Sequence, residues 1–446
     1  MNSTKERIIK EIKENQEKLC GIFSPNDEFI KIYEKMKPIS KEIPEFANTP
    51  KEIFEEFNYC FYDKSYCSAE SITEQELQLQ FAKNINAVVL INGYFSKEKS
   101  NIISKNLIVK GLAEKTKEDF FTIEQYFRNY FDVYENQLTA LNSILTKDGA
   151  FIQIPKNAVI EEPICIFSII TEQDKPYFFN ERILVIAEEN AEATIFRKDF
   201  SKSENATVMV CITLLQQAAN SKINHYQIYS NNLQNNNLQI NNSQKTEQKF
   251  NTFTAYEFSL QENATLNNFS FYCTSAYLKS VENIKLLGKN ATVNNNSFNF
   301  LKKANNIIDT KAHTFHQAEQ TNSNHLVKAI ASNDSHFIFD GKIFVEPEAQ
   351  KTDAKQQSKI ILLDDNSKAD CNPHLEIYAD DVSCSHGTAI GNLDDDLLFY
   401  LNSRGIGQNE AQKLLLVAFA GEIIEKISNP ALKEFFTSNL EFEINN

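Results

Sequence analysis

Short, β-rich apolar segments follow one another between residues 149 and 363, and they constrain the fold more than any other feature of the sequence. They are separated by turn-forming residues, with no helical segment between them, and comprise FIQI (151–154), ICIFSII (164–170), RILVIA (182–187), TVMVCITLL (207–215), YQIYS (226–230), FTAYEFSL (253–260), TLNNFSFYC (265–273), HFIFDGKIFV (336–345) and KIILL (359–363). Many short strands without intervening helices indicate an all-β solenoid, sandwich or barrel. Among these we favour a parallel β-helix, in which each coil buries its inner face against neighbouring coils.

A small-residue signature recurs at or near the start of several of these segments. It reads Ala193-Thr194, Asn205-Ala206-Thr207, Asn263-Ala264-Thr265 and Asn290-Ala291-Thr292. The spacing is irregular, so the segments are not a strict-period array. The Asn-rich stretch NNLQNNNLQINN (231–242) has two interpretations, a ladder of Asn side chains on one solenoid corner or a mobile loop.

The residues before and after this β-rich part have a different pattern. Residues 1–135 are predicted to be mainly helical, with a capping box at 3–6, a short strand with an Asn-Gly turn at 87–94, and a helix over 117–142. Residues 136–393 form the predicted β-helix core. Residues 394–446 form a predicted helical domain, in which Asp394 to Asp396 start one helix and a stripe of Leu416, Phe419, Ile423 and Ile427 marks the next. That stripe fits core packing or a docking surface for another protein.

The charge balance narrows the classes of partner. The chain of 446 residues carries 60 acidic and 45 basic side chains, a formal net charge of −15. Nucleic acid needs a basic surface, so it is not expected as the main partner. No apolar run reaches the length of a membrane span. The first 18 residues have no apolar signal region and are too acidic for a transit peptide, so the default expectation is a cytoplasmic location.

Residues 378–391, YADDVSCSHGTAIG, contain the most informative candidate site. Cys384 and His386 stand two positions apart, and in a strand such side chains emerge on the same face. A thiolate and an imidazole together suit iron, copper or zinc. Two ligands do not complete a tetrahedral site, so another source must supply the rest. The alternative interpretation is a buried thiol beside a hydrogen-bonded histidine.

Other titratable residues give weaker candidates. Cys371 and His374 would complete a zinc-like spacing, but they have opposite parity in a strand and flank a proline. Asp380 and Asp381 could pair as acid and base, but adjacent strand residues face opposite ways, so turn and capping roles are favoured. The remaining histidines considered, which are His313, His316, His325 and His336, lack a carboxylate motif and are interpreted as packing or surface residues.

Common nucleotide-binding and hydrolase motifs are absent from the sequence. It contains no GxxxxGK[ST], GxGxxG or GxSxG. These absences count against a chain that is itself an ATPase, a dehydrogenase or an α/β-hydrolase.

The sequence resembles the SufB/SufD family of iron–sulfur cluster assembly scaffolds, and its SufD members more closely than its SufB members. The matching run covers FDGKIFVEPEAQKTDAKQQSKIILL (339–363), PHLEIYADDVSCSHGTAIGNLDDDLLFYLNSRGI (373–406) and AQKLLLVAFAGEII (411–424). A weaker match covers residues 139–166, and a fainter one covers LINGYF (90–95). The first 85 residues add little to the resemblance.

The resemblance implies a fold, partners and site residues. It implies a right-handed parallel β-helix core flanked by N-terminal and C-terminal helical regions. It also implies a non-catalytic scaffold that pairs with SufB through the β-helix and binds the ATPase SufC through the C-terminal helices. Cys384 and His386 become candidate ligands of a nascent, transient cluster shared with SufB, with no cofactor held stably by the lone chain. The implied SufC-docking residues are Phe399, Tyr400, Leu401, Arg404, Gly405, Leu415 and Phe419.

Two other functions stay open at this point. A β-helix enzyme acting on acidic polysaccharide would use the solenoid and the Asp380-Asp381 pair, but the net negative charge and the helical tail argue against it. A SufB-like role would make this chain the principal carrier of the cluster.

Overall fold

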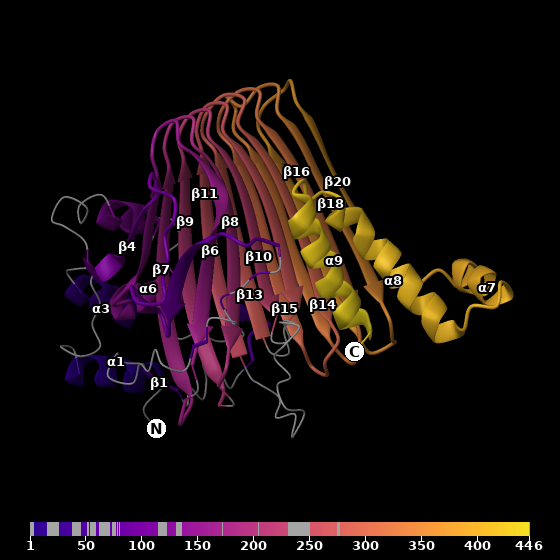
Figure 1. Ribbon diagram of the computed structural model, residues 1–446, viewed down its shortest axis with the longest axis horizontal. Helices are drawn as coiled ribbons and strands as arrows, with labels where there is room; N and C mark the ends of the chain where they lie inside the picture. The colour runs from indigo at the N-terminus through magenta and orange to yellow at the C-terminus, as the bar shows by residue number, and fades with distance from the viewer. Residues whose placement is uncertain are drawn as a thin grey trace.

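Two sheets face each other across the core, and successive strands of the chain alternate between them (Figure 1). The computed structural model describes residues 4–15, 26–37, 46–50, 53, 59–61, 72–73, 77, 79, 81–114, 123–130, 136–171, 173–203, 205–230, 250–273 and 277–445. Each strand from β5 to β18 pairs in parallel with the strand two positions later in the chain. The chain therefore winds into a parallel β-solenoid of about seven turns.

Sheet 1 contains the odd-numbered strands apart from β3, together with β4. From its N-terminal to its C-terminal edge it comprises β4 (Ile108–Gly111), β5 (Gly149–Ile154), β7 (Tyr177–Ala187), β9 (Thr207–Gln217), β11 (Phe250–Leu260), β13 (Tyr277–Leu286), β15 (Ile307–His316), β17 (His336–Val345) and β19 (Lys368–Ile377), with β1 (Cys60–Phe61) beside β7.

Sheet 2 contains the even-numbered strands apart from β4, together with β3. In the same direction it comprises β3 (Tyr94–Phe95), β2 (Asn86–Ile91), β6 (Val159–Ile170), β8 (Glu192–Ser201), β10 (Lys222–Ser230), β12 (Thr265–Cys273), β14 (Thr292–Leu301), β16 (Asn322–Ala331), β18 (Asp353–Leu362) and β20 (Ser383–Gly391). The predicted parallel β-helix is thus confirmed.

Alternate side chains of each strand point into the space between the sheets, which we call the lumen. In β18, for example, Ala354 and Gln356 are buried, whereas Lys355 and Gln357 are exposed. Ile, Val and Leu side chains of both sheets fill much of the lumen in one continuous cluster. At its N-terminal end the loop and strand residues Phe95, Ile102, Leu107 and Val109 cover that cluster.

One corner of the solenoid explains part of the small-residue signature. Asn157, Asn190, Asn220, Asn263 and Asn290 all have φ between 55° and 60°, a left-handed conformation that Asn tolerates better than most residues. Side-chain hydrogen bonds of 2.7 to 3.0 Å join neighbouring members, across sequence separations of 33, 43 and 27 residues. The irregular period arises because the coils differ in length, not because the corner differs. The stretch 231–242 lies outside the described residues.

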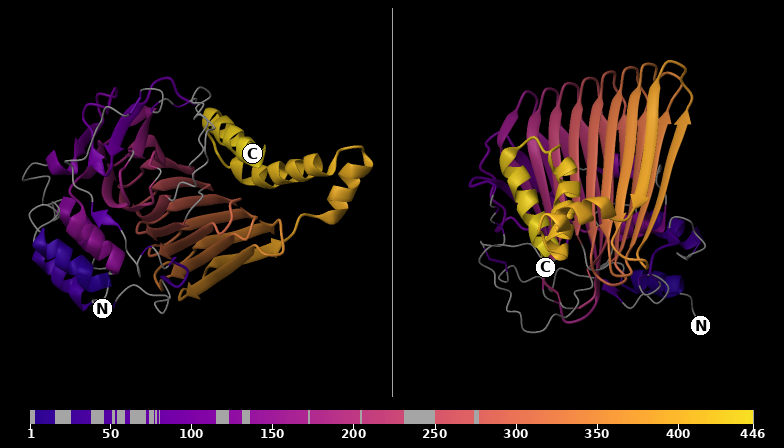
Figure 2. Two further views of the ribbon diagram at one scale, coloured as in Figure 1. Left: turned by 90° about the horizontal axis from the view of Figure 1, so that it is seen from below. Right: turned by 90° about the vertical axis from the view of Figure 1, so that its right-hand side faces the viewer.

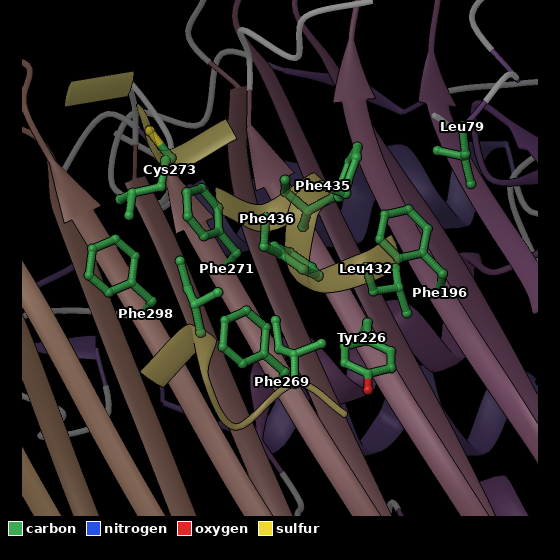
Figure 3. Close-up of a cluster of buried hydrophobic side chains, with 14 of the residues drawn as sticks. Leu79, Phe196, Tyr226, Phe269, Phe271, Cys273, Phe298, Leu432, Phe435 and Phe436 are labelled. Carbon is green, nitrogen blue, oxygen red and sulfur yellow. The ribbon is translucent and has the colours of Figure 1, made fainter. Parts of the chain in front are cut away.

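The C-terminal helices pack on the outer face of sheet 2 (Figure 3). These are α8 (Gln408–Ile424) and α9 (Pro430–Asn445), and α7 (Asp395–Ser403) precedes them. Phe436 of α9 is fully buried against Phe269 and Phe271 of β12. Burying such a ring contributes roughly 2 kcal/mol. The stripe that includes Leu416 and Ile423 is buried in the same cluster, which confirms its core-packing interpretation.

The N-terminal helices lie on the outer face of sheet 1. They comprise α1 (Thr4–Glu14), α3 (Asn26–Lys35) and α6 (Gln137–Leu145). A short helix, η5 (Leu112–Glu114), follows β4 directly in the chain. The strand and Asn-Gly turn predicted at 87–94 are confirmed by β2 and by the positive φ of Asn92 and Gly93.

The single helix predicted over 117–142 is wrong. Asn136 is extended and caps a new helix, α6, by accepting hydrogen bonds from the backbone N–H groups of Leu138 and Thr139. A local cap therefore overrides the apolar periodicity that runs through this segment. No helix in the described part of the chain is long and apolar enough to cross a lipid bilayer.

Candidate functional site

The C-terminal end of the solenoid is open, and it carries the candidate site. β19 and β20 are the last described strands of their sheets, so each has a neighbouring strand on one side only (Figure 2). Their side chains are mostly exposed or half-buried, in contrast to the buried strands before them. Apolar side chains at this end are also accessible: Ile377 is 38 %, Tyr378 60 % and Ile390 43 % exposed.

Cys384 and His386 both lie on the lumen side of β20. Cys384 is in register with the buried Ala354, and His386 is in register with the buried Gln356. Neighbours in register share one face of a parallel sheet, so the two side chains point the same way, as their spacing predicts. Cys384 is half-buried and His386 is exposed at the open end.

The thiol of Cys384 packs beside a small apolar cluster formed by Ile343, Val345, Ala349, Ala354 and Ala379. Burial raises the pKa of this thiol, and the nearby carboxylate of Asp353 raises it further. The free chain therefore holds Cys384 mainly as the protonated thiol at neutral pH. Binding a metal or cluster there requires loss of that proton.

Cys371 and His374 do not complete a closed zinc site. Cys371 packs against the apolar residues of the lumen, whereas His374 has the opposite parity in β19 and faces outward, near Asp340. Among the described residues there is no group of three or more His, Cys, Asp or Glu side chains that could hold a metal ion. Cys384 and His386 thus provide two donors of a site and not a complete one.

The remaining candidates have structural roles. His316 and His325 are buried, and burial lowers the pKa of each below its usual range. His313 and His336 lie 3.2 and 2.7 Å from the carboxylates of Asp340 and Asp370.

Asp380 and Asp381 lie in the turn between β19 and β20. The backbone N–H of Asp381 donates to the Gln350 side chain, and its carbonyl accepts from the N–H of Lys351. These backbone contacts fit the turn role and give the polysaccharide-enzyme interpretation no support.

Helix α7 projects away from the solenoid (Figures 1 and 2). It also exposes aromatic side chains. Phe399 is 74 % and Tyr400 53 % exposed, and no residue of the helix is buried. The Arg404 guanidinium lies over the Tyr400 ring, 5.2 Å from its centroid. Gly405 ends the helix with φ of 90°, a conformation that favours glycine. Leu401 is half-buried on the same helix.

The other two predicted docking residues lie on α8. Leu415 is half-buried. Phe419 is also half-buried, but its ring packs against the cluster that joins α8 to sheet 2, and the Lys328 ammonium lies 4.3 Å from the ring centroid. Phe419 therefore helps to fix α8 on the sheet, whereas the exposed aromatic surface belongs to α7.

Comparisons with known proteins agree with this architecture. Residues 82–166 match the SufBD protein N-terminal region, and residues 169–419 match the SufBD core domain of SUF system FeS cluster assembly. The chain belongs to the SufBD family. The matching core model carries the description SUF system FeS cluster assembly, and curated members of the family are named iron–sulfur cluster assembly proteins.

Several curated members of the SufBD family are similar to the chain. The iron–sulfur cluster assembly protein SufD of Escherichia coli is 33 % identical over 247 residues, which cover 55 % of this chain and 54 % of that protein. A SufBD family protein of Synechocystis is 26 % identical over 359 residues, 78 % of this chain and 75 % of the relative. A SufBD family protein of Staphylococcus epidermidis is 26 % identical over 330 residues, which cover 73 % of this chain and 66 % of that relative. The match thus spans about half of the first relative.

A row of polar side chains beneath His386 escaped the sequence analysis. Reading along sheet 2, the register aligns His225, Asn268, Asn295, His325 and Gln356 with His386 on the lumen side. The first three are linked by hydrogen bonds of 2.7 and 2.8 Å. No residue type marks this row in the sequence, because it depends on which strands pair and in which register. The lumen thus contains a polar row that ends at the candidate site.

The Gln356 amide occupies a space that a glycine leaves open. A Cβ atom on Gly341 would lie 2.4 Å from the Gln356 Nε2. That nitrogen is buried and has no hydrogen-bond partner among the described residues. The Gln356 Nε2, which is next to His386 in this row, is therefore a hydrogen-bond donor that the described part of the chain does not use.

We predict that Asp353→Asn speeds alkylation of Cys384 by iodoacetamide at pH 8 by about threefold, because removing the carboxylate lowers the thiol pKa and increases the thiolate fraction. Peptide mass spectrometry measures the rate at this one cysteine. Asp381→Asn removes an exposed carboxylate at the same end of the solenoid and should leave the rate unchanged. An equal or slower rate in Asp353→Asn would show that this carboxylate does not act on Cys384.

Proposed function

We propose that this SufBD family protein is a non-catalytic scaffold subunit whose open end pairs with a SufB-like homologue. The observation that carries the proposal is the exposed last coil, on which two potential ligands face the lumen. A strand edge with free backbone donors and acceptors favours pairing with another strand. A homologue of the same architecture would offer a matching edge.

The same pairing would supply the missing ligands of the candidate site. Cys384 and His386 provide one soft sulfur donor and one imidazole, a set that suits iron and iron–sulfur clusters. We propose that they hold a nascent cluster transiently, as cargo, together with ligands from the SufB-like partner. Burial of Cys384 in the assembled interface would also shield the cluster from solvent.

Helix α7 is the proposed docking element for a SufC-like ATPase. Exposed aromatic residues such as Phe399 and Tyr400 are typical anchors of protein interfaces. The helix extends away from the solenoid, so a partner can reach its exposed side (Figure 2). ATP hydrolysis would belong to that partner, since this sequence contains no phosphate-binding loop of the GxxxxGK[ST] type.

The first prediction of this proposal concerns His386→Ala in a complex co-expressed with the SufB-like and SufC-like partners. We expect the complex to elute intact from size-exclusion chromatography but to hold at least about threefold less iron and acid-labile sulfide, because one ligand is lost. His374→Ala is the matched control, since His374 lies on the neighbouring edge strand but faces outward. Equal iron and sulfide in the two variants would remove His386 from the site, and a wild-type chain that never co-elutes with a partner would reject the scaffold proposal.

The second prediction separates the two docking surfaces. Phe399→Ala should weaken binding of the ATPase by about tenfold or more, the loss expected for an aromatic anchor, and should leave pairing with the SufB-like partner intact. Leu287→Ala, an exposed apolar residue on a solenoid corner, is the control and should change neither interaction. Isothermal titration of the purified ATPase into each variant measures the effect. An unchanged affinity in Phe399→Ala would place the ATPase elsewhere.

A further inference from the structure

A cavity of about 270 Å³ opens on the outer face of sheet 1, away from the candidate site. Its floor is formed by strands β9, β11, β13 and β15, and part of its wall by the start of α6. The candidate site lies on β20, at the end of the solenoid. The cavity is therefore separate in space from Cys384 and His386.

One half of this cavity is apolar. Strands β9 and β11 contribute Val210, Ile212, Phe253 and Ala255, and Leu138 of α6 lies above them. Such a surface favours a flat hydrocarbon or aromatic group.

The other half of the cavity is basic. Strands β13 and β15 contribute Lys279, Lys311, His313 and Asn283, and no carboxylate is among the described residues that line the space. Lys279 is buried and donates to Asp309 at 2.8 Å, so its charge is balanced. The cavity thus spans four strands, with an apolar end at β9 and β11 and a donor-rich end at β13 and β15.

One donor at the basic end has no partner in the protein, and a second makes only a long ion pair. The Nδ2 of Asn283 is buried and has no hydrogen-bond partner in the part of the chain that is described. The Lys311 ammonium forms an ion pair with the Asp340 carboxylate at 3.6 Å, which is longer than a hydrogen bond, and His313 shares that carboxylate at 3.2 Å. The strand register makes Lys311 and Asn283 diagonal neighbours. A buried donor without an acceptor destabilises the fold, so an acceptor from a ligand would be favourable here.

We propose that this cavity binds a small organic anion, with its charged headgroup at Lys311 and Asn283 and its apolar body against Phe253 and Leu138. The headgroup class is a carboxylate or a similar oxyanion, because the unpartnered Asn283 group is a donor and the charged lining is basic. The volume of about 270 Å³ is sufficient for a body of one aromatic ring. A neutral analogue of the same shape lacks the charge-assisted hydrogen bonds and binds more weakly.

The test uses 4-fluorobenzoate and the neutral 4-fluorobenzyl alcohol as probes, followed by ¹⁹F NMR titration of the full chain. We expect saturable binding of 4-fluorobenzoate in the millimolar range that a ligand of this size reaches, and much weaker binding of the alcohol. Lys311→Met should weaken binding of the anion by about tenfold, the loss expected for a charge-assisted hydrogen bond.

Lys342→Met is the matched control. Lys342 lies on the next strand of the same face, pairs with Glu376 at 2.6 Å and is not among the described residues that line the cavity, so the anion should bind this variant normally. Asn283→Leu, checked for an unchanged thermal transition, should also weaken binding. Equal affinity for both probes, equal loss in the two lysine variants, or no saturable binding of 4-fluorobenzoate would overturn the proposal.

Discussion

Parallel pairing between successive coils is the constraint on which this structure depends. Each coil buries its inner side chains and completes its backbone hydrogen bonds only by stacking on the coils beside it. The first and last coils have a neighbouring coil on one side only. The first coil is covered by antiparallel strands and by residues such as Phe95 and Leu107. The last coil, formed by β19 and β20, is left exposed, and the two potential ligands lie on it. The way the solenoid ends therefore determines the exposure of the candidate site, because Cys384 and His386 lie on its last strand, β20.

Much of the fold could be predicted from the sequence, because β-rich segments, turn residues and the absence of helices together indicate a solenoid. The strand and Asn-Gly turn near Gly93 and the buried stripe of α8 were predicted for similarly local reasons. The break at Asn136 was not, because a cap competes with periodicity there. The row from His225 to His386 could not be predicted at all, since it exists only once the register between distant strands is fixed.

The candidate site is predictable only in part for the same reason. The i, i+2 spacing placed Cys384 and His386 on one face, and opposite parity separated Cys371 from His374. The free amide of Gln356 and the space above Gly341 depend on packing across the lumen between two sheets, which no local pattern reports. The structure therefore shows what surrounds a pair of residues that the sequence had already identified.

Hydrogen–deuterium exchange of the chain alone and with a SufB-like partner tests the central claim most directly. If the open end is the pairing surface, backbone amides of β19 and β20 should exchange quickly in the lone chain and become at least about tenfold slower in the complex, because edge amides gain hydrogen-bond partners. Strands β9 to β13, which already have neighbours on both sides, should not change. Slower exchange elsewhere, with β20 unaffected in a stable complex, would contradict the account.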